Sequence, residues 1–197
     1  DAMRRYQTGP GSVRADLWMD VILRASAPAN ASSAEADSVA PQSSGPASNH
    51  ASSIDVAAKL LATWDRQYTK DNHQAILFET TVGNVTRLLW DELQDSTGSR
   101  VATPGGDVTL SLLSQPQNAW WDVTATPNAR EDRDIVLRRA LGEAFDTLAA
   151  RLGPASPENW RWGRVRPARI GHLLRLRGFS AESVAVQGGF GTLNPSA

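Results

Sequence analysis

Cysteine is absent from this sequence of 197 residues. Its absence excludes disulfide bonds, thiol nucleophiles and cysteine-ligated zinc or iron–sulfur centres, and it leaves the cellular compartment open. Histidine is scarce, and His50, His73 and His172 are spaced so that no two imidazole groups share one helical face. This spacing disfavours a metal site. No apolar run approaches the roughly 18 residues that cross a bilayer, so no membrane span is expected.

An excess of charge of one sign is also lacking, because 20 basic residues stand against 21 acidic ones and leave a formal net charge of -1. Nothing in this balance requires a polyanionic partner, which disfavours nucleic acid. Six arginines between positions 161 and 177, close to Trp160 and Trp162, could in principle grip nucleic acid or an anionic membrane. We expect instead that they pair with carboxylates or shield apolar surface with their stems.

Fingerprints of a nucleophile elbow, a phosphate loop and a dinucleotide-binding turn are missing. The run Gly188-Gly189-Phe190-Gly191 lacks the lysine of a phosphate loop. Glycine clusters of this kind are typical of tight turns that need positive φ angles or close backbone contact, so we predict a structural turn. Trp120 and Trp121 could stack on a sugar, but such pairs more often pack in the core.

One stretch of low complexity interrupts the sequence. Residues 26–53 are rich in Ala, Ser, Pro and Asn and contain no aromatic residue, lysine or arginine. Such a segment buries too little to offset its ordering entropy, so we predict a disordered surface insertion within one domain over residues 1–197. The sequence starts at Asp1 and stops in a turn-rich stretch, and we expect both ends to be interior to a longer protein.

Hydrophobic periodicity predicts a mostly α fold. Ser12 is placed to cap a first helix with Val13, Leu17, Val21 and Ile22 at helical spacing. Pro127 is expected at the first position of the last long helix, which Gly153 ends. Only Ser183–Gln187 is a strand candidate. The predicted helices cover, approximately, residues 12–25, 54–64, 75–90 and 127–152.

Several short runs occur in an order that resembles one known family. They are Met3-Arg4-Arg5-Tyr6-Gln7 with Ser12; Leu60-Leu61-Ala62-Thr63-Trp64-Asp65; Leu77-Phe78 and Leu89-Trp90; Trp120-Trp121-Asp122 with Glu131–Leu137; Trp160-Arg161-Trp162-Gly163; His172-Leu173; and Gly188–Asn194. Together they resemble the C-terminal half of the β-chain in the penicillin acylase family of N-terminal-nucleophile hydrolases. The sequence departs from the family pattern at Gly9, where aspartate is usual, at Arg166, where histidine is usual, and at Leu173, where proline is usual.

The resemblance implies that this is an internal or C-terminal part of a β-chain in an αββα sandwich. It implies a precursor that cuts itself and an N-terminal serine that hydrolyses amides with its own α-amino group as base. No residue here matches the nucleophile or the oxyanion hole, so no catalytic, cofactor or metal residue is assigned, and any structural calcium would belong to other parts of the parent. The residues expected to be structural are Trp160, Trp162, Gly163, His172, Gly188, Gly189, Gly191 and Asn194.

The family also suggests a function for the parent: hydrolysis of linear amides such as acylated β-lactams or N-acyl homoserine lactones, in the periplasm or outside the cell. The expected partners are the remainder of the acylase α- and β-chains and a small amide substrate, and the chain by itself is predicted to be inactive. The alternative is a helical binding or adaptor module without activity, or a degenerate acylase-like domain.

Overall fold

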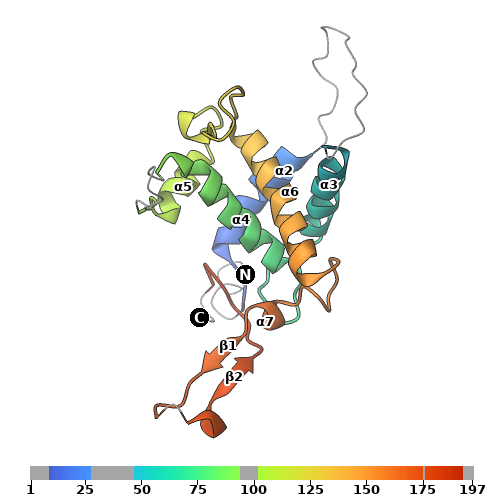
Figure 1. The fold of residues 1–197 in the computed structure, drawn as a ribbon, viewed down its shortest axis with the longest axis vertical. Helices are drawn as coiled ribbons and strands as arrows, with labels where there is room; N and C mark the ends of the chain where they lie inside the picture. The colour runs from blue at the N-terminus through green and yellow to red at the C-terminus, as the bar shows by residue number, and fades with distance from the viewer. Residues whose placement is uncertain (1–8, 28–46, 94–101, 175, 193–197) are drawn as a thin grey trace.

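The structure is a computed structural model that describes residues 9–27, 47–93, 102–174 and 176–192. The predicted mostly helical fold is confirmed: Figure 1 shows the helices gathered into one body, from which a small β-hairpin projects. The longer helices are α2 (Val13–Ser26), α3 (Ala47–Ala62), α4 (Ala75–Leu89) and α6 (Arg133–Leu152). The short elements are η1 (Asp91–Leu93), α5 (Gly106–Leu112), η2 (Ala119–Trp121), α7 (Trp162–Val165), β1 (Ala168–Ile170), η3 (Arg177–Phe179) and β2 (Ala181–Val184).

Helix α2 begins where the sequence predicts. Ser12 caps it, because the Ser12 Oγ accepts a hydrogen bond from the Ala15 amide at 3.2 Å. The buried face differs from the predicted stripe, since Val13 is 47% and Leu17 53% exposed. Ile22 of the predicted stripe is buried as expected, and the other buried apolar residues of the helix are Ala15, Trp18, Met19 and Ala25. Helix α2 therefore leaves part of its apolar surface uncovered.

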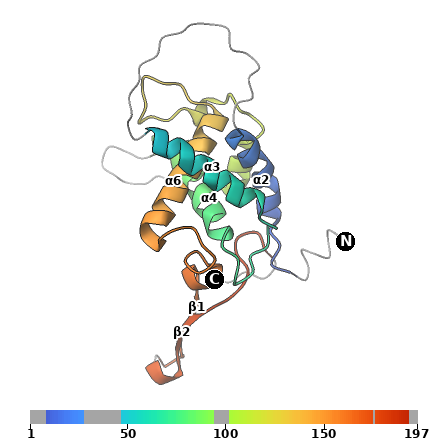
Figure 2. The same cartoon turned by 90° about the vertical axis from the view of Figure 1, so that its right-hand side faces the viewer.

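Helices α4 and α6 form the centre of the body. Helices α2, α3 and α4 all pack against α6, and Figure 2 shows them side by side. Consecutive residues Ala75–Phe78 of α4 are all buried, which confirms that this helix is covered on more than one side. Burial of apolar surface on α4 and α6 is thus the main stabilising contribution to the fold.

Helix α6 starts later than predicted. Pro127 lies in a turn before it, and the true cap is Asp132, whose Oδ1 accepts a hydrogen bond from the Ile135 amide at 3.0 Å. The residues before the cap are held by Glu131, whose carboxylate accepts from the Thr126 hydroxyl at 2.5 Å and from the Val123 amide at 3.3 Å. The predicted end is confirmed, because Gly153 follows the helix with φ 88°.

Helix α3 extends into the stretch that the sequence assigns to a low-complexity insertion. It begins at Ala47, so residues 47–53 are helical rather than disordered. Ser53 Oγ donates a hydrogen bond to the Asp146 carboxylate of α6 at 2.7 Å, which ties this end of α3 to the body. Residues 28–46 lie outside the described residues, and for them disorder stays a prediction.

The single predicted strand, Ser183–Gln187, is displaced and has a partner that the sequence did not indicate. Strand β2 spans Ala181–Val184 and pairs with β1 in antiparallel register, Ala168 opposite Val184 and Ile170 opposite Ala181. Alternation of apolar and polar residues is weak in both strands, because neither lies on a core. This explains why the period-two signal failed.

Six of the seven tryptophans are buried, and together with Leu and Val residues they fill the core. Trp121 is fully buried, as expected, but Trp120 is 39% exposed and leans edge-on against Trp90 with ring centroids 5.1 Å apart. The expectation of core packing is therefore right for Trp121 and only partly right for Trp120. Among the described residues, no helix is long and apolar enough to cross a membrane.

Candidate functional site

Part of the set of residues singled out by the sequence, namely Trp162 and the glycines of residues 188–191, comes together where the chain returns from the hairpin to the helical body. We call this contact the clasp. It consists of the glycine turn, residues 188–192, of the side chains that the turn touches, Ser12, Arg14, Tyr68 and Trp162, and of Glu79, which lies beneath them and accepts hydrogen bonds from Arg14 and Tyr68. The side chains that the turn touches come from the start of α2, from the segment before α4 and from α7, so the clasp joins three separate parts of the chain.

Backbone hydrogen bonds form the frame of the clasp. The Tyr68 amide donates to the Pro10 carbonyl at 2.9 Å, and the Tyr68 carbonyl accepts from the Gly188 amide at 2.8 Å. On the other side of the turn, the Trp162 indole Nε1 donates to the Gly188 carbonyl at 2.9 Å. Trp162 is 4% exposed, so this hydrogen bond satisfies an indole N–H that would be costly to bury alone.

Glycine is favoured at three positions of the turn, beginning with Gly188, whose φ is 95°. A Cβ on Gly189 would lie 2.6 Å from Tyr68 Cδ1 and 3.1 Å from Trp162 Cζ2, so any side chain would push the aromatic rings apart. Gly191 has φ 74°, and a Cβ there would lie 2.9 Å from the Cβ of Arg14. The prediction of a structural turn that needs positive φ angles and close contact is confirmed.

Ser12 links the two ends of the described chain. Besides capping α2, its Oγ donates a hydrogen bond to the Phe190 carbonyl at 3.0 Å, and the residue is fully buried. The Phe190 ring itself is 70% exposed and lies 5.4 Å from the Arg14 guanidinium. One hydroxyl group therefore fixes both the start of the first helix and the glycine turn.

Tyr68 is the centre of a buried polar group beneath the turn. Its hydroxyl donates to Glu79 Oε1 at 2.5 Å, and Arg14 Nη1 donates to both Glu79 oxygens at 3.1 and 2.9 Å. Burial and the Glu79 carboxylate raise the pKa of Tyr68 far above its usual value, although Arg14 and Ser12 oppose the shift. The phenol stays protonated at neutral pH, and it serves as a donor that holds Glu79 in place.

The Trp160–Gly163 run anchors the start of the hairpin. Trp160 is fully buried, donates its indole N–H to the Gly153 carbonyl at 3.0 Å and packs edge-on against Phe145. The Gly163 amide donates to the Lys70 carbonyl at 2.8 Å. A Cβ on Gly163 would be 3.0 Å from that of Ala185, so the two ends of the hairpin touch at this glycine. The predicted structural role of these residues agrees with their contacts.

His172 lies apart from the clasp, on the hairpin. Its Nδ1 accepts a hydrogen bond from the Leu174 amide at 3.3 Å, its own amide donates to the Ser180 hydroxyl at 3.0 Å, and its ring lies 5.4 Å from Phe179. These contacts hold the shape of the hairpin end. Asn194, the last of the predicted structural residues, lies outside the described residues.

The arginines after Trp160 do not all pair with carboxylates. Arg161 lies 3.8 Å from the Asp71 carboxylate, and Arg164 donates to the Glu158 carbonyl at 3.0 Å. Arg166 and Arg169 are exposed, and within the described part of the chain neither has a carboxylate partner. For these two residues, at the base of the hairpin, the structure shows no carboxylate pairing among the described residues, and the alternative that their stems shield apolar surface stays a prediction.

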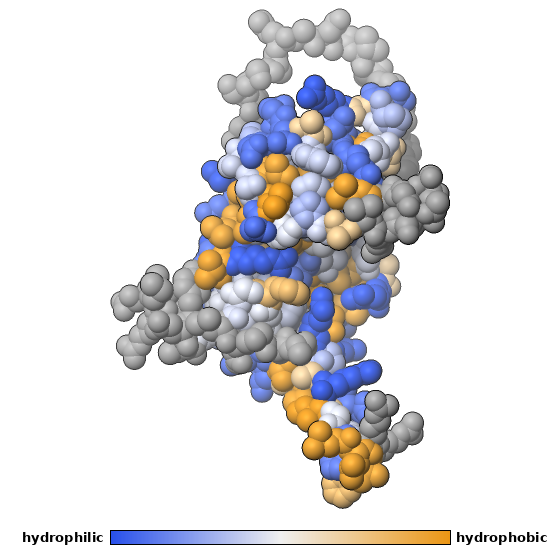
Figure 3. Space-filling model, turned by 90° about the vertical axis from the view of Figure 1, so that its left-hand side faces the viewer, coloured by the Kyte–Doolittle hydropathy of each residue, from blue (hydrophilic) through white to orange (hydrophobic). Residues whose placement is uncertain are grey.

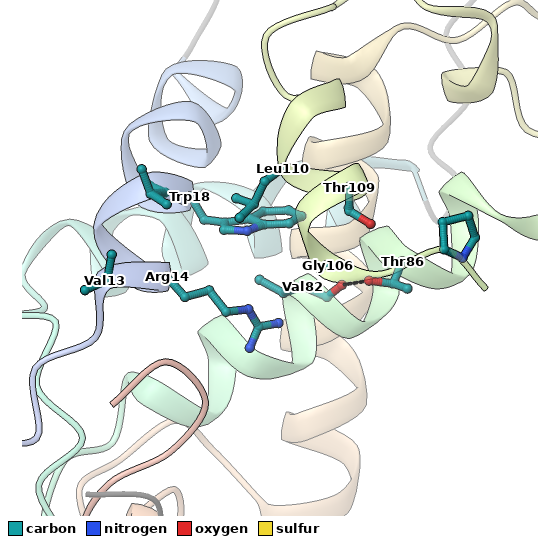
Figure 4. Close-up of a pocket in the computed structure, with 10 residues that line it drawn as sticks. Val13, Arg14, Trp18, Val82, Thr86, Gly106, Thr109 and Leu110 are labelled. Carbon is teal, nitrogen blue, oxygen red and sulfur yellow. Dashed lines mark hydrogen bonds between the residues drawn. The ribbon is translucent and has the colours of Figure 1, made fainter. Parts of the chain in front are cut away.

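A cavity of about 350 Å³ opens between α2, α4 and α5 (Figure 4). Trp18, Val82 and Leu110 give it apolar walls, and Arg14 reaches across its lower side toward α4. The two hydroxyl groups at its edge are already engaged, since Thr86 donates to the Val82 carbonyl at 2.9 Å and Thr109 accepts from the Trp90 indole at 3.3 Å. The cavity thus offers shape and apolar surface rather than reactive groups.

Sequence reasoning missed three members of this site: Arg14, Tyr68 and Glu79. They come from three separate segments, and no local pattern indicates that Glu79 on α4 receives hydrogen bonds from both of the others. Among the described residues, no group of three His, Cys, Asp or Glu side chains is arranged to hold a metal ion.

The fold and the clasp define a helical layer in which Trp162 and closely packed glycines hold one backbone turn against the core. The sequence model of the family described as penicillin amidase matches residues 1–197, so the chain belongs to the penicillin amidase family, an acylase-like family of hydrolases. Membership of this family suggests other acylase chains as partners. A search of curated proteins finds no match to the chain.

Proposed function

We propose that the chain is a structural part of an amide hydrolase in which an N-terminal serine outside this chain carries out the chemistry. The parent would cleave linear amides such as acylated β-lactams or N-acyl homoserine lactones. Its serine would attack the amide carbonyl, its α-amino group would take the proton, and an asparagine with backbone amides would stabilise the oxyanion. The family resemblance supports these roles, and we propose from the same resemblance that the parent acts in the periplasm or outside the cell.

The observation that carries the proposal is the engagement of the polar groups at the clasp. The Tyr68 hydroxyl, the Glu79 carboxylate and the Arg14 guanidinium bond to one another beneath the turn. A general base needs a lone pair within reach of a substrate proton, whereas Glu79 has a side chain only 7% exposed and already accepts three hydrogen bonds. Groups arranged in this way support a backbone, and they do not act on a substrate.

The proposed task of the clasp is to hold the turn at residues 188–192 next to the active-site cleft of the parent. The turn is small and rigid, which suits a wall that a substrate must pass closely. Some family members bind structural calcium. Among the described residues, no three His, Cys, Asp or Glu side chains are grouped to hold a metal ion, and the proposal assigns no role to a metal.

The experiment is the Gly189→Val substitution in the complete protein. The added side chain would meet Tyr68 and Trp162, displace the turn and impair either self-cleavage of the precursor or turnover of a chromogenic acyl anilide. Gly83→Val is the matched control, because Gly83 is exposed on α4 and no atom lies within 4 Å of a Cβ at that position. Intact mass measures processing, and initial rates measure turnover.

Normal processing together with unchanged kinetics in Gly189→Val would contradict the proposed task of the clasp. A complete protein that neither cleaves itself nor hydrolyses any acyl amide would contradict the enzyme and favour a binding module. The upstream sequence adds a further test, because a Gly-Ser processing site followed by an asparagine-containing segment is expected there.

A further inference from the structure

The hairpin that follows α7 ends in a cluster of uncovered apolar side chains. Figure 3 shows this end of the molecule as a predominantly apolar surface at the tip of a narrow projection. We call it the hairpin tip and define it by Ile170 (59% exposed), Leu173 (97%), Leu174 (75%), Leu176 (47%) and Phe179 (75%). Single exposed apolar residues are common, but a contiguous cluster marks a surface that another molecule covers.

We propose that the hairpin tip inserts into an apolar recess on the remainder of the acylase, the other parts of the parent protein. The recess would carry acidic groups at its rim. This inference rests on the proposed function, since it takes the chain to be one part of a larger hydrolase, and it names the element by which that part is held.

The base of the hairpin is built to present the tip rigidly. Trp162 is locked to the Gly188 carbonyl at 2.9 Å, and the close approach of Gly163 to Ala185 brings the two ends of the hairpin together. Between these fixed ends, the two strands pair only as a two-stranded sheet, an arrangement that is marginally stable in water without further contacts. A partner surface would supply those contacts, and the anchored base lowers the ordering cost of docking.

Charge on the hairpin indicates what surrounds the recess. Arg166 and Arg169 are exposed and have no carboxylate partner among the described residues. From position 166 to position 184 the sequence contains four arginines against the single glutamate Glu182, and no aspartate. An acidic rim would complement this surplus and would steer the tip to its recess.

Two other occupants fit the observations less well. A second copy of the chain would bring together two basic hairpins, whose like charges repel each other. A lipid membrane would accept the apolar side chains but leave the open edges of β1 and β2 without hydrogen-bond partners. A protein surface can satisfy both the side chains and the strand edges.

The test is cysteine labelling in the complete, processed protein, quantified by mass on the peptide that carries the introduced residue. Leu173→Cys and Phe179→Cys are compared with Ala129→Cys, which lies in an exposed loop of the helical body. The chain has no cysteine of its own, so the signal from each peptide is unambiguous. Each variant is treated with a maleimide in its native state and after unfolding in urea. The labelling rate of the unfolded protein is the reference for the native rate at the same residue.

The expected result is that residues 173 and 179 react at least about tenfold more slowly in the native protein than after unfolding, because burial limits access to the thiol. Residue 129 should react at similar rates in both states. Equal native and unfolded rates at residues 173 and 179 would overturn the proposal. Protection that appears only with phosphatidylglycerol vesicles would assign the tip to membranes, and protection lost on dilution would assign it to a second copy.

Labelling does not depend on catalysis, so the two proposals can fail separately. A parent without amide hydrolysis but with protected residues 173 and 179 would overturn the enzyme alone. An active parent with freely reacting residues would overturn the docking alone.

Discussion

The clasp and the hairpin tip are neighbours in the sequence but opposite in character. At the clasp, Ser12, Tyr68 and Trp162 are buried and hydrogen-bonded, and glycines are needed because no space remains. At the tip, leucines and a phenylalanine point outward with little to touch. The run that resembles the acylase family spans both regions. The comparison teaches that one family motif serves two purposes: it joins the end of the described chain to the helical body, and it presents an exposed apolar surface on the hairpin.

The largest expected loss of stability is for a leucine of the helical body, Leu137, and its counterpart in the hairpin is Leu173. Leu137 is fully buried on α6, so Leu137→Ala should lower the free energy of unfolding by about 2–5 kcal/mol. Urea unfolding followed by tryptophan fluorescence measures the change. A loss below about 0.5 kcal/mol, the range of surface substitutions, would break the distinction by showing that α6 is not the centre of the core.

The next prediction concerns the polar part of the clasp. Tyr68→Phe removes the hydroxyl that donates to Glu79 and should cost about 1.5–3 kcal/mol at neutral pH, the range for hydrogen bonds to charged groups. Thr86→Val is a useful control, because its hydroxyl bonds only to the carbonyl of its own helix. A Tyr68→Phe variant as stable as the parent chain would show that Arg14 alone satisfies Glu79.

The same residue predicts a pH dependence. The pKa of Tyr68 is raised in the folded chain, chiefly by burial and then by Glu79, whereas in the unfolded chain it stays near 10. Its contribution to stability is therefore complete below about pH 10 and is lost above it, by up to about 1.4 kcal/mol per pH unit. Urea titrations between pH 9 and 11 should show a shallower loss in Tyr68→Phe. Identical slopes in the two proteins would contradict the buried phenol.

Two glycine substitutions sharpen the comparison further. Gly189→Ala places a Cβ 2.6 Å from the Tyr68 ring and should cost about 1–3 kcal/mol, the range for overpacked cores. Gly171→Ala, in the hairpin, places a Cβ in open space and should change little. Urea midpoints of the two variants give the answer. Equal effects would mean that the turn yields as easily as the hairpin.

The smallest effect is expected at the tip. Leu173 is 97% exposed, so Leu173→Ala should shift the unfolding free energy of the 197-residue chain by no more than about 0.5 kcal/mol. The counterpart measurement is the same substitution in the complete protein, where docking would make the loss larger. A large loss already in the chain by itself would show that the tip folds back onto the helical body.

Local patterns in the sequence predicted much of the helical body. Ser12 as a cap, the apolar residues of 75–89 and Gly153 as a helix end are all signals within one or two turns of chain. The start of α6 was misplaced because Pro127 gives a strong local signal, yet the hydrogen bonds of Glu131 hold the preceding residues in turns. At this point, specific side-chain hydrogen bonds override the local preference for a helix start.

The clasp was only half predictable. The glycine turn can be predicted from its composition. Its partners cannot, because the sequence around Tyr68 and Glu79 does not indicate that these residues are buried or hydrogen-bonded to each other. Their roles follow from packing between segments far apart in sequence. The strand β1 was missed for a related reason: an exposed hairpin imposes no alternation on its residues, so there was no pattern to find.

The hydrogen bond from Ser12 to Phe190 spans 178 positions and has a consequence for synthesis. Helices α2, α3, α4 and α6 contact one another directly, so much of their packing can form before the hairpin is synthesised, and Trp160 adds its contact with Phe145 of α6 afterwards. The clasp must wait until residue 192 has emerged, and its closure is then a loop-closing step across nearly the whole chain. A chain truncated before the glycine turn would leave the Ser12 hydroxyl without its bond to the Phe190 carbonyl and the Tyr68 carbonyl without its bond from the Gly188 amide.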